Sequence, residues 1–290
     1  MKVSNTKIKR FNDSAIKAVC QCALPPQMRH EKIQSIKFFN RELHTGGFVL
    51  NTIHSFKPKH IEFLVKKWQD DGLSIGRIKN LMSHLRFTCK LINKPSIICS
   101  NIEYGLGNRS VICTKNRAIH DIKNIDKIGP ENLRASLRLQ QAFGLRREEC
   151  LKIKPHLADN GAYIRLEPTW TKGGVGRVIP ILNDEQRGAL DTAKRLVEES
   201  QSMIPQDKTF IQWRRFYDRE TRLAGNKSMH GLRHAYAQKR YFELTGHKSP
   251  ICGGPKPASR QEKELDLIAR KTISQELGHA RVQITRAYLG

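Results

Sequence analysis

The last stretch of the sequence, ELGHARVQITRAYLG (residues 276–290), decides how the fold and chemistry of the chain are interpreted. It places Tyr288 nine residues after His279 and two residues before the last residue. A lone tyrosine at this distance from a histidine is ordinarily a packing residue. Its meaning therefore depends on which reactive side chains the rest of the chain supplies.

Three further short motifs precede this stretch, and each carries one or two charged or titratable side chains. Taken singly, each would be explained as a solvated or ion-paired surface group. A histidine and an arginine three residues apart, as in the third motif, share one face of a helix. The motifs are FGLRREEC (143–150) with Arg146 and Glu149, TKGGVGR (171–177) with Lys172, and HGLRHAY (230–236) with His230 and Arg233.

Together these side chains form a set suited to phosphoryl transfer. Arg146 and Arg233 can hold the non-bridging oxygens of a phosphodiester and stabilise the extra charge of its transition state. A tyrosine hydroxyl in water has a pKa near ~10, so it needs a base, and His230 can accept its proton. Lys172 on a hairpin tip can protonate the leaving sugar oxygen, and His279 can donate a further hydrogen bond to the phosphate. The set needs no metal or other cofactor, which fits the lack of an acidic cluster in the sequence.

The composition points to a polyanionic partner. The chain has 52 Lys and Arg against 27 Asp and Glu, a net charge of +25, with +14 over residues 1–129 and +11 over the remainder. This charge favours nucleic acid as the partner, and its spread favours two positive faces around it. No apolar run reaches the ~20 residues of a membrane span, and the N-terminus lacks a signal-peptide core, so we expect an intracellular protein.

The seven cysteines are expected to be reduced thiols. They are odd in number and scattered, and the first two lie too close together for the usual zinc spacing. The seven are Cys20, Cys22, Cys89, Cys99, Cys113, Cys150 and Cys252.

The N-terminal part of the chain has the pattern of a helical bundle. Apolar residues recur at helical spacing in KHIEFLVKKWQDDG (59–72) and SIGRIKNLMSHLRFTCKLI (74–92), with Ser74 as an N-cap, and 28–44 reads as a further helix. Few acidic residues interleave with the basic ones between the apolar stripes, which favours a phosphate-facing surface over a merely solvated one. The candidate DNA-binding residues are Lys66, Lys67, Arg77, Lys79, Arg86 and Lys90.

The C-terminal part is predicted to be mainly α with a small antiparallel β-sheet. Two β-prone runs, about 162–167 and 177–181, flank a glycine-rich turn and read as a hairpin. Between the two parts, the apolar residues of 94–129 do not recur at a helical or strand period. Within this region, 116–129 is the expected linker. Helical patterns cover a segment opening at Pro130 and the segments 185–201, 209–223, 230–245 and 260–276.

The ordered set of motifs resembles the tyrosine recombinases, the family of phage integrases and chromosome-dimer resolvases. The resemblance spans residues 144–288 and fills all six family positions in order, with Glu149 at the acidic position that supports the first arginine. It implies that Tyr288 attacks a DNA phosphate, forming a 3′-phosphotyrosyl link and releasing a 5′-hydroxyl. The 5′-hydroxyl of another strand then attacks the link. The motifs that carry it are GLRREE, TKGGVGRVIPI, HGLRH, LGH and the tyrosine near the end.

The resemblance also implies an organisation and a set of partners. Residues 1–115 would be an N-terminal helical core-binding domain, and residues 130–290 an α+β catalytic domain. The partners would be double-stranded DNA, three further copies in a homotetramer on paired sites, and accessory DNA-bending or excision factors. The protein would be cytoplasmic, nucleoid-associated and encoded by a bacterium or phage, and would integrate or excise a mobile element.

Two features depart from the family pattern, and two other functions stay open. The interval from Arg233 to His279 is longer than usual, with the extra residues in a Pro- and Gly-rich stretch at about 246–262 that reads as a surface loop. Only Leu289 and Gly290 follow the tyrosine, where relatives usually continue with a docking helix. The alternatives are a DNA-binding protein without catalysis and a tyrosine-type topoisomerase. Integration, inversion and dimer resolution are not distinguished.

Overall fold

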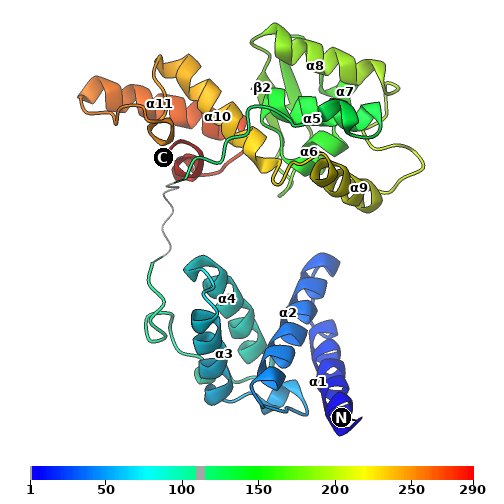
Figure 1. Ribbon diagram of the computed structural model, residues 1–290, viewed down its shortest axis with the longest axis vertical. Coiled ribbons are helices and arrows are strands. Elements are labelled where there is room, and N and C mark those ends of the chain that lie inside the picture. Colours follow the sequence, from blue (N-terminus) through cyan, green and yellow to red (C-terminus); the bar gives the residue numbers. More distant parts are fainter. Residues whose placement is uncertain (1, 109–114) are drawn as a thin grey trace. The chain divides into compact units, whose positions relative to one another are not determined.

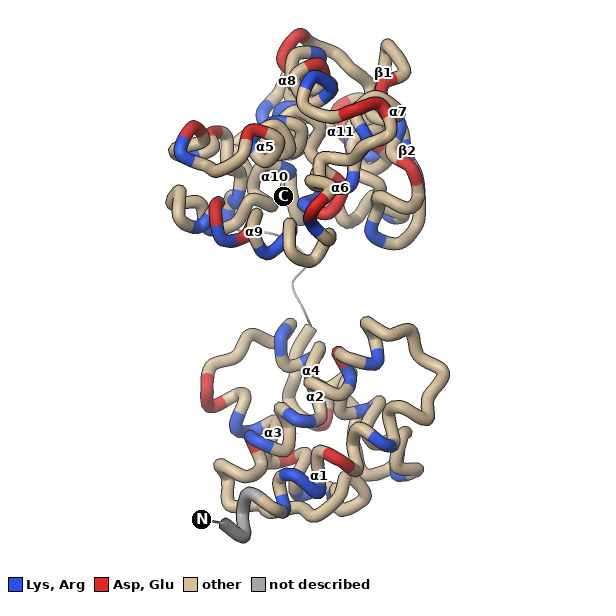
Figure 2. Tube along the Cα trace, turned by 90° about the vertical axis from the view of Figure 1, so that its right-hand side faces the viewer, with Lys and Arg blue, Asp and Glu red and all other residues tan. Residues whose placement is uncertain are grey.

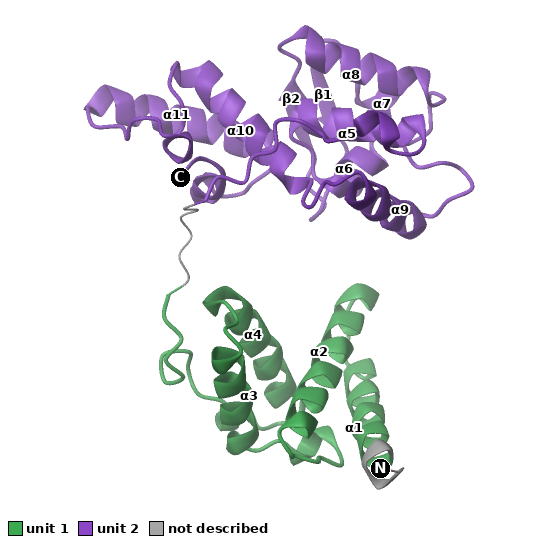
Figure 3. Ribbon diagram, viewed as in Figure 1, with its two compact units in different colours: residues 1–110 green, residues 111–290 purple. Residues whose placement is uncertain are grey.

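The computed structural model describes residues 2–108 and 115–290, with side chains from Thr6 onward. The chain forms two compact units, Met1–Ser110 and Val111–Gly290 (Figure 3). Each unit has its own cluster of buried apolar side chains. Six of the cysteines are free thiols, and the seventh, Cys113, lies outside the described residues.

Unit 1 is helical, as its apolar spacing predicts (Figure 1). In the second half of the unit, Ser74 caps a helix by accepting a hydrogen bond from the backbone N–H of Arg77 at 3.3 Å. Ile75, the first apolar residue of the predicted helix 74–92, is 42 % exposed and not buried like the apolar residues that follow it. A residue in the first turn of a helix has neighbours on one side only. The elements are α1 (Lys2–Cys20), α2 (Pro26–Thr45), η1 (Ile53–Ser55), α3 (Pro58–Asp70), α4 (Ile75–Leu91) and η2 (Pro95–Ile97).

The core of unit 1 forms around Trp68, the last residue of the apolar stripe predicted for α3. Its ring lies 5.8 Å from that of Phe39 and 6.4 Å from that of Phe38, both on α2. Helix α1, which the sequence analysis left unassigned, contributes Phe11 and Ala15, both fully buried. The apolar residues of α1 recur every four positions among many basic ones, so its stripe is narrow.

Unit 2 is mainly helical with one antiparallel hairpin, as expected from the sequence (Figure 1). In the hairpin Tyr163 faces Pro180 and Leu166 faces Arg177. The turn between the strands contains Gly173 at φ +100°, which only glycine adopts readily. The elements are η3 (Ile125–Lys127), α5 (Glu131–Phe143), α6 (Arg147–Lys152), α7 (Pro155–Ala158), β1 (Tyr163–Leu166), η4 (Pro168–Trp170), β2 (Arg177–Pro180), α8 (Asp184–Arg195), α9 (Phe210–Leu223), α10 (His230–Thr245), η5 (Pro250–Cys252), α11 (Arg260–Glu276), η6 (Val282–Thr285) and α12 (Arg286–Leu289).

The segment 116–129, expected as a linker, packs on unit 2. Ile128 is 1 % exposed, and the backbone N–H of Ile119 donates to the Gly231 carbonyl at 3.0 Å. A Cβ at Gly231 would lie 2.6 Å from the Arg117 carbonyl oxygen, so the glycine permits this close approach. The segment packs on the unit, where a linker was expected, because burying its isoleucines stabilises unit 2.

The Pro- and Gly-rich stretch after α10 forms a loop only as far as Ser259. Ser259 then caps α11 by accepting from the backbone N–H of Glu262 at 3.1 Å, so the charged end of the predicted loop is helical. Within the loop, η5 packs against α12. The loop therefore helps to hold the helix that carries Tyr288. In the described residues no helix is long and apolar enough to cross a membrane.

Candidate active site

The first, third and fourth motifs meet in unit 2, where four short chain segments come together. Arg146 precedes α6, Arg233 lies in the first turns of α10, His279 follows the end of α11, and Tyr288 is in α12. In Figure 1, α10, α11 and α12 lie together beside the C-terminus. Residues up to 142 positions apart in sequence are thus brought to one place by the packing of these elements.

Arg233 is the buried centre of this cluster. Its side chain is fully buried, and its Nη1 donates to the Gly144 carbonyl oxygen at 2.6 Å. Its Nη2 donates to the Leu277 carbonyl oxygen, and its Nε to the Tyr288 hydroxyl at 3.4 Å. Burial lowers the pKa of Arg233 to about 10, well above neutrality, so the guanidinium stays charged. A fixed cation therefore lies against the tyrosine.

Tyr288 is 4 % exposed and lies among aromatic and cationic side chains. Its hydroxyl lies 3.2 Å from Nε2 of His279. Its ring centroid is 4.6 Å from that of His234 and 5.6 Å from that of His279. The fold therefore places the hydroxyl of Tyr288, the candidate nucleophile, beside Arg233 and His279.

The partners of His279 determine which of its nitrogens carries the proton. Nε2 lies 3.2 Å from Nη2 of Arg233, and a guanidinium can only donate. Nε2 is thus the acceptor, and the neutral ring carries its proton on Nδ1. Desolvation, followed by the charges of Arg233 and Arg146, lowers the pKa of His279 to about 3. In the free chain, the nitrogen facing Tyr288 is consequently an acceptor, so the predicted donation to a phosphate requires either a change of tautomer or protonation of the ring.

His230, predicted as the base, lies beside the tyrosine without a hydrogen bond to it in the described residues. Its ring centroid is 6.1 Å from that of Tyr288, and the residue is exposed. Partial desolvation of the ring, then the charges of Arg233 and Arg146, lower the pKa of His230. His230 is therefore neutral at pH 7 and able to accept a proton, but His279 is the histidine within reach of the hydroxyl.

Glu149, predicted to support the first arginine, is fully buried between two arginines. Arg146 donates to it through Nη1 to Oε1 at 2.7 Å and through its backbone N–H to Oε2 at 2.7 Å. Arg177 donates Nη1 to Oε1 at 2.9 Å and Nη2 to Oε2 at 2.6 Å. These bonds outweigh the opposing effect of burial and lower the pKa of Glu149 to about 2. Glu149 is thus a buried carboxylate at neutral pH.

The C-terminal turn of α11 supplies acceptors to all three arginines. Arg177 Nε donates to the Glu276 carbonyl oxygen at 2.7 Å, and Arg146 Nη2 to that of Gly278 at 3.2 Å. The Leu277 carbonyl between them receives Arg233. Carbonyls at the end of a helix carry partial negative charge and attract cations. This turn, Glu276–Gly278, is the element that gathers the arginines.

Lys172 stands apart from the cluster. It is exposed in the turn between β1 and β2. No hydrogen bond or ion pair joins its side chain to any other described residue. The two glycines that follow it have φ of +100° and +70°. The structure therefore brings five of the six predicted residues together and leaves the lysine on the hairpin tip.

Two residues of the cluster were not predicted from the sequence. Arg177 lies in the quoted motif TKGGVGR, but its role depends on Glu149, 28 positions away. His234 is 7 % exposed, and desolvation, then the charges of His230 and Arg117, lower its pKa to about 4. A histidine one turn after His230 was a visible signal, because residues four apart share a helix face.

The six candidate DNA-binding residues of unit 1 lie on α3 and α4. In α4, Lys79, Arg86 and Lys90 lie within about 40° of one another, and Arg77 lies on the other flank of the buried stripe. Lys67 pairs with Asp71 at 2.7 Å and Arg86 donates to Asn101, whereas the other four side chains have no such partner in the described part of unit 1. Figure 2 shows Lys and Arg spread along the chain in both units.

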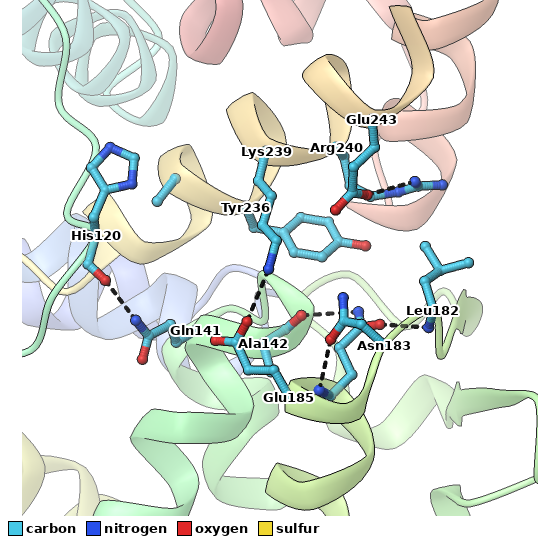
Figure 4. A pocket seen from close by; sticks show the side chains of 12 residues that line it. His120, Gln141, Ala142, Leu182, Asn183, Glu185, Tyr236, Lys239, Arg240 and Glu243 are labelled. Atoms are coloured by element: carbon cyan, nitrogen blue, oxygen red, sulfur yellow. Dashed lines mark hydrogen bonds and ion pairs between the residues drawn. The ribbon is translucent and has the colours of Figure 1, made fainter. Parts of the chain in front are cut away.

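Unit 2 also has a partly open cavity outside the cluster (Figure 4). It has a volume of about 170 Å³ between α5, α8 and α10, and Lys239 pairs with Glu185 at 2.9 Å across its lining. None of the six predicted site residues lines it. Among residues 2–108 and 115–290, no group of three or more His, Cys, Asp or Glu is placed to hold a metal ion.

Comparisons with known proteins match both parts of the chain. Residues 22–96 match the family model described as phage integrase, N-terminal, and residues 105–239 match the one described as integrase. No curated protein matches the sequence.

Solved structures share the fold at low sequence identity. A lambda integrase dimer bound to a COC′ core site is 18 % identical with a TM-score of 0.61, covering 99 % of this chain and 79 % of that one. A lambda integrase tetramer bound to a Holliday junction is 17 % identical with a TM-score of 0.57, covering 93 % and 76 %. The Tn1549 transposon integrase in complex with circular intermediate DNA is 10 % identical with a TM-score of 0.55, covering 96 % and 95 %.

Proposed function

The chain belongs to the tyrosine recombinase family and is a site-specific recombinase of the integrase type, and from this premise we propose that Tyr288 is its nucleophile. The observation that carries the proposal is the position of the Tyr288 hydroxyl, 3.4 Å from Nε of Arg233 and 3.2 Å from Nε2 of His279. A buried tyrosine with a packing role alone would need neither a fixed cation nor a histidine at its oxygen.

The proposed reaction exchanges one phosphoester for another. The Tyr288 oxygen attacks a DNA phosphorus and loses its proton, and the bond from phosphorus to the 5′-oxygen breaks. The products are a 3′-phosphotyrosyl link and a strand with a free 5′-hydroxyl. The 5′-hydroxyl of another strand then attacks the link and returns the tyrosine. The number of phosphoesters is conserved, so the exchange consumes no energy source.

Arg146 and Arg233 are the groups proposed to hold the phosphate. Both are fixed by backbone carbonyls before substrate arrives, Arg233 by Gly144 and Leu277 and Arg146 by Gly278. Donors fixed in this way need no reorganisation when negative charge develops in the transition state. Arg146 is partly exposed, which leaves part of its guanidinium free for a phosphate oxygen.

The two histidines are proposed to have different tasks, set by their pKa values. A base with a pKa of about 3, as for His279, has little driving force to take a phenolic proton. The pKa of His230 is lowered too, but its ring has no guanidinium donating to it in the described residues, whereas Nε2 of His279 accepts from Arg233, so His230 is the better base. A phosphate beside His279 would raise its pKa, because a nearby negative charge favours the protonated ring. His279 would then donate to that phosphate.

Lys172 is proposed as the acid that protonates the leaving 5′-oxygen. Its position at the glycine-rich tip of the β1–β2 hairpin supports this, since the tip can move without disturbing the strands. In the free chain it is exposed and has no partner in the described residues, so nothing opposes its movement toward DNA.

Unit 1 and unit 2 are proposed to act as the core-binding and catalytic domains on double-stranded DNA. The net charge of +25 and the basic residues of α3 and α4 support this. The solved lambda integrase tetramer bound to a Holliday junction supports a homotetramer on paired sites. DNA-bending or excision factors are proposed as further partners from the family resemblance alone. The proposed role is integration and excision of a mobile element, in the cytoplasm and on the nucleoid of a bacterium.

A suicide substrate tests the function. Nicked duplexes made from the DNA flanking the gene lose a short strand after cleavage, so a covalent intermediate accumulates. We expect an SDS-stable adduct between protein and DNA, whose phosphopeptide contains Tyr288. Joining of two separate sites, in a reaction with intact duplexes, distinguishes a recombinase from a relaxing topoisomerase. Binding to the sites without any adduct would contradict the proposal.

A further inference from the structure

Arg177 has contacts that set it apart from the arginines proposed to hold the phosphate. Its side chain is 6 % exposed, against 22 % for Arg146. Each of its three nitrogens has a partner: two face the two carboxylate oxygens of Glu149, and the third faces the Glu276 carbonyl. Arg233 is equally enclosed, but its donors face neutral carbonyls, His279 and Tyr288, whereas two nitrogens of Arg177 are committed to one buried carboxylate.

The charges around Glu149 explain how Arg177 affects the net charge beside Arg146. Glu149 fixes Arg146 in place with a charged side-chain bond and a backbone bond. A carboxylate that fixes a cation also cancels its charge. With Arg146 and Glu149 alone, the pair would be neutral, and its attraction for a phosphate would be small. With Arg177 added, the group of three carries one net positive charge, and Arg146 is the member that is most exposed.

We propose that Arg177 is the counterion of Glu149, which lets Glu149 orient Arg146 without neutralising it. Arg177 is thus a positioning and charge-balancing residue that acts through Glu149 and Arg146 and does not touch the DNA. The inference rests on the proposed function, because it concerns the arginine assigned to the phosphate. Because Arg177 also begins β2 and binds the end of α11, it joins the hairpin of Lys172 to the turn that precedes His279.

The charge of Glu149 provides a test that separates this role from a structural one. Arg177→Met leaves an unbalanced carboxylate beside Arg146, and we expect cleavage to fall on the order of 10²-fold, as for loss of a transition-state donor. Adding Glu149→Gln removes that carboxylate, so the double variant should cleave faster than Arg177→Met by about 10-fold or more. Because Glu149→Gln also relieves the destabilising effect of an unpaired buried carboxylate, the rates are compared at a temperature at which thermal unfolding shows both variants to be fully folded.

A neutral phosphate gives an independent measurement. In a methylphosphonate, one non-bridging oxygen is replaced by a methyl group, so the substrate carries no negative charge for Arg146 to attract. The ratio of wild-type to Arg177→Met adduct formation should therefore shrink markedly on a methylphosphonate at the cleavage position. An equal ratio on both substrates would overturn the proposal, as would a double variant no better than the single.

Further variants complete the design. Arg177→Lys keeps the charge but loses the planar guanidinium, so it should stay within about 10-fold of the wild type. Arg177→Gln, which also removes the charge, replaces Arg177→Met if that variant does not fold. Arg187→Met, which breaks a distant ion pair with Asp159, should cleave like the wild type on both substrates. A lysine variant as impaired as Arg177→Met contradicts the charge role. A wild-type chain that cleaves no site contradicts the proposed function itself, and so is told apart from failure of this inference.

Discussion

The cations of unit 2 and those of unit 1 are held in different ways. At the candidate site, Arg146, Arg177 and Arg233 are each fixed by backbone carbonyls, and two of them share a buried carboxylate. In unit 1, Lys66 and Lys90 are exposed and have no side-chain partner among the described residues. Fixed cations in a desolvated site suit charge that appears at one atom, whereas free cations suit a polyanion whose phosphates lie along a line.

The difference teaches that the same residue types serve two kinds of contact. A cation whose position is fixed before binding stabilises the transition state more than the ground state. A mobile cation at a surface contributes mainly through release of counterions from the DNA. Substitutions in the two regions should therefore change different observables: the rate of cleavage for unit 2, and the affinity and its salt dependence for unit 1.

Removal of the nucleophile should have the largest effect. Tyr288→Phe keeps the ring against His234 but removes the oxygen that attacks phosphorus, so adduct formation should be abolished while DNA binding remains. Denaturing gel electrophoresis of the suicide-substrate reaction measures the adduct, and a gel-shift titration measures binding. An adduct that persists in this variant would move the nucleophile to another tyrosine, with Tyr236 and Tyr241 as the next candidates.

Substitution of the phosphate-holding arginines should come next. Arg146→Ala and Arg233→Ala should each slow cleavage on the order of 10²-fold or more, because each removes a donor to the transition state. Affinity for DNA should change far less, since many other phosphate contacts remain. Arg233 is fully buried, so thermal unfolding of Arg233→Ala must be measured alongside. Near-normal cleavage by either variant would remove that arginine from the site.

Lys172→Ala should slow cleavage by about 10²-fold, the lower end of general acid catalysis. The defect should disappear on a substrate with a 5′-bridging sulfur, because a thiolate leaves without needing a proton. Single-turnover rates on the oxygen and sulfur substrates make the comparison. Equal impairment on both would assign the exposed lysine a phosphate contact of the kind expected in unit 1.

The dependence of cleavage on pH should reveal the lowered pKa of His230. Because this pKa lies below the ordinary 6.5, the neutral base persists as the pH falls through 6.5, and protonation inactivates it only at lower pH. Adduct formation at sub-saturating DNA, which reports the free protein, should thus decline at a lower pH than for a histidine of ordinary pKa. The decline should weaken in His230→Gln. An acid limb centred above 6.5 would contradict the assignment of His230 as base.

Single lysines of unit 1 should have the smallest effects. Lys90→Ala should reduce the slope of log affinity against log salt by about 0.9, the value for one phosphate contact. Lys67→Ala should reduce it less, since Lys67 already pairs with Asp71 at 2.7 Å and Glu42 at 3.5 Å. Neither should change the rate of cleavage at saturating protein. Equal slopes for Lys90→Ala and the wild type would exclude Lys90 from the DNA-binding surface.

The sequence predicted well those features that local spacing encodes. Apolar residues recur at helical spacing in α3, and a glycine-rich turn separates two β-prone runs in the hairpin. The structure confirms both the helix and the hairpin. The role of Arg177 and the lowered pKa of His279 could not be predicted from the sequence, because each depends on atoms brought close by folding. For Arg177 these are the oxygens of Glu149, and for His279 the guanidinium of Arg233, 46 positions away.

The turn Glu276–Gly278 has a consequence for how the site tolerates mutation. Its three acceptors are main-chain carbonyls, which every amino acid supplies, so a side-chain replacement at 276 or 277 leaves the arginines their partners. Gly278 differs, because its φ is +65° and a Cβ there would lie 2.9 Å from Cδ of Arg177. Alanine replacement at 276 or 277 would instead report the side chains, because Glu276 pairs with Arg240 at 2.9 Å and Leu277 is fully buried, and so would give little hint that the backbone organises the site. The turn organises the site through the path of its backbone, and Gly278 is the residue whose replacement would disturb that path.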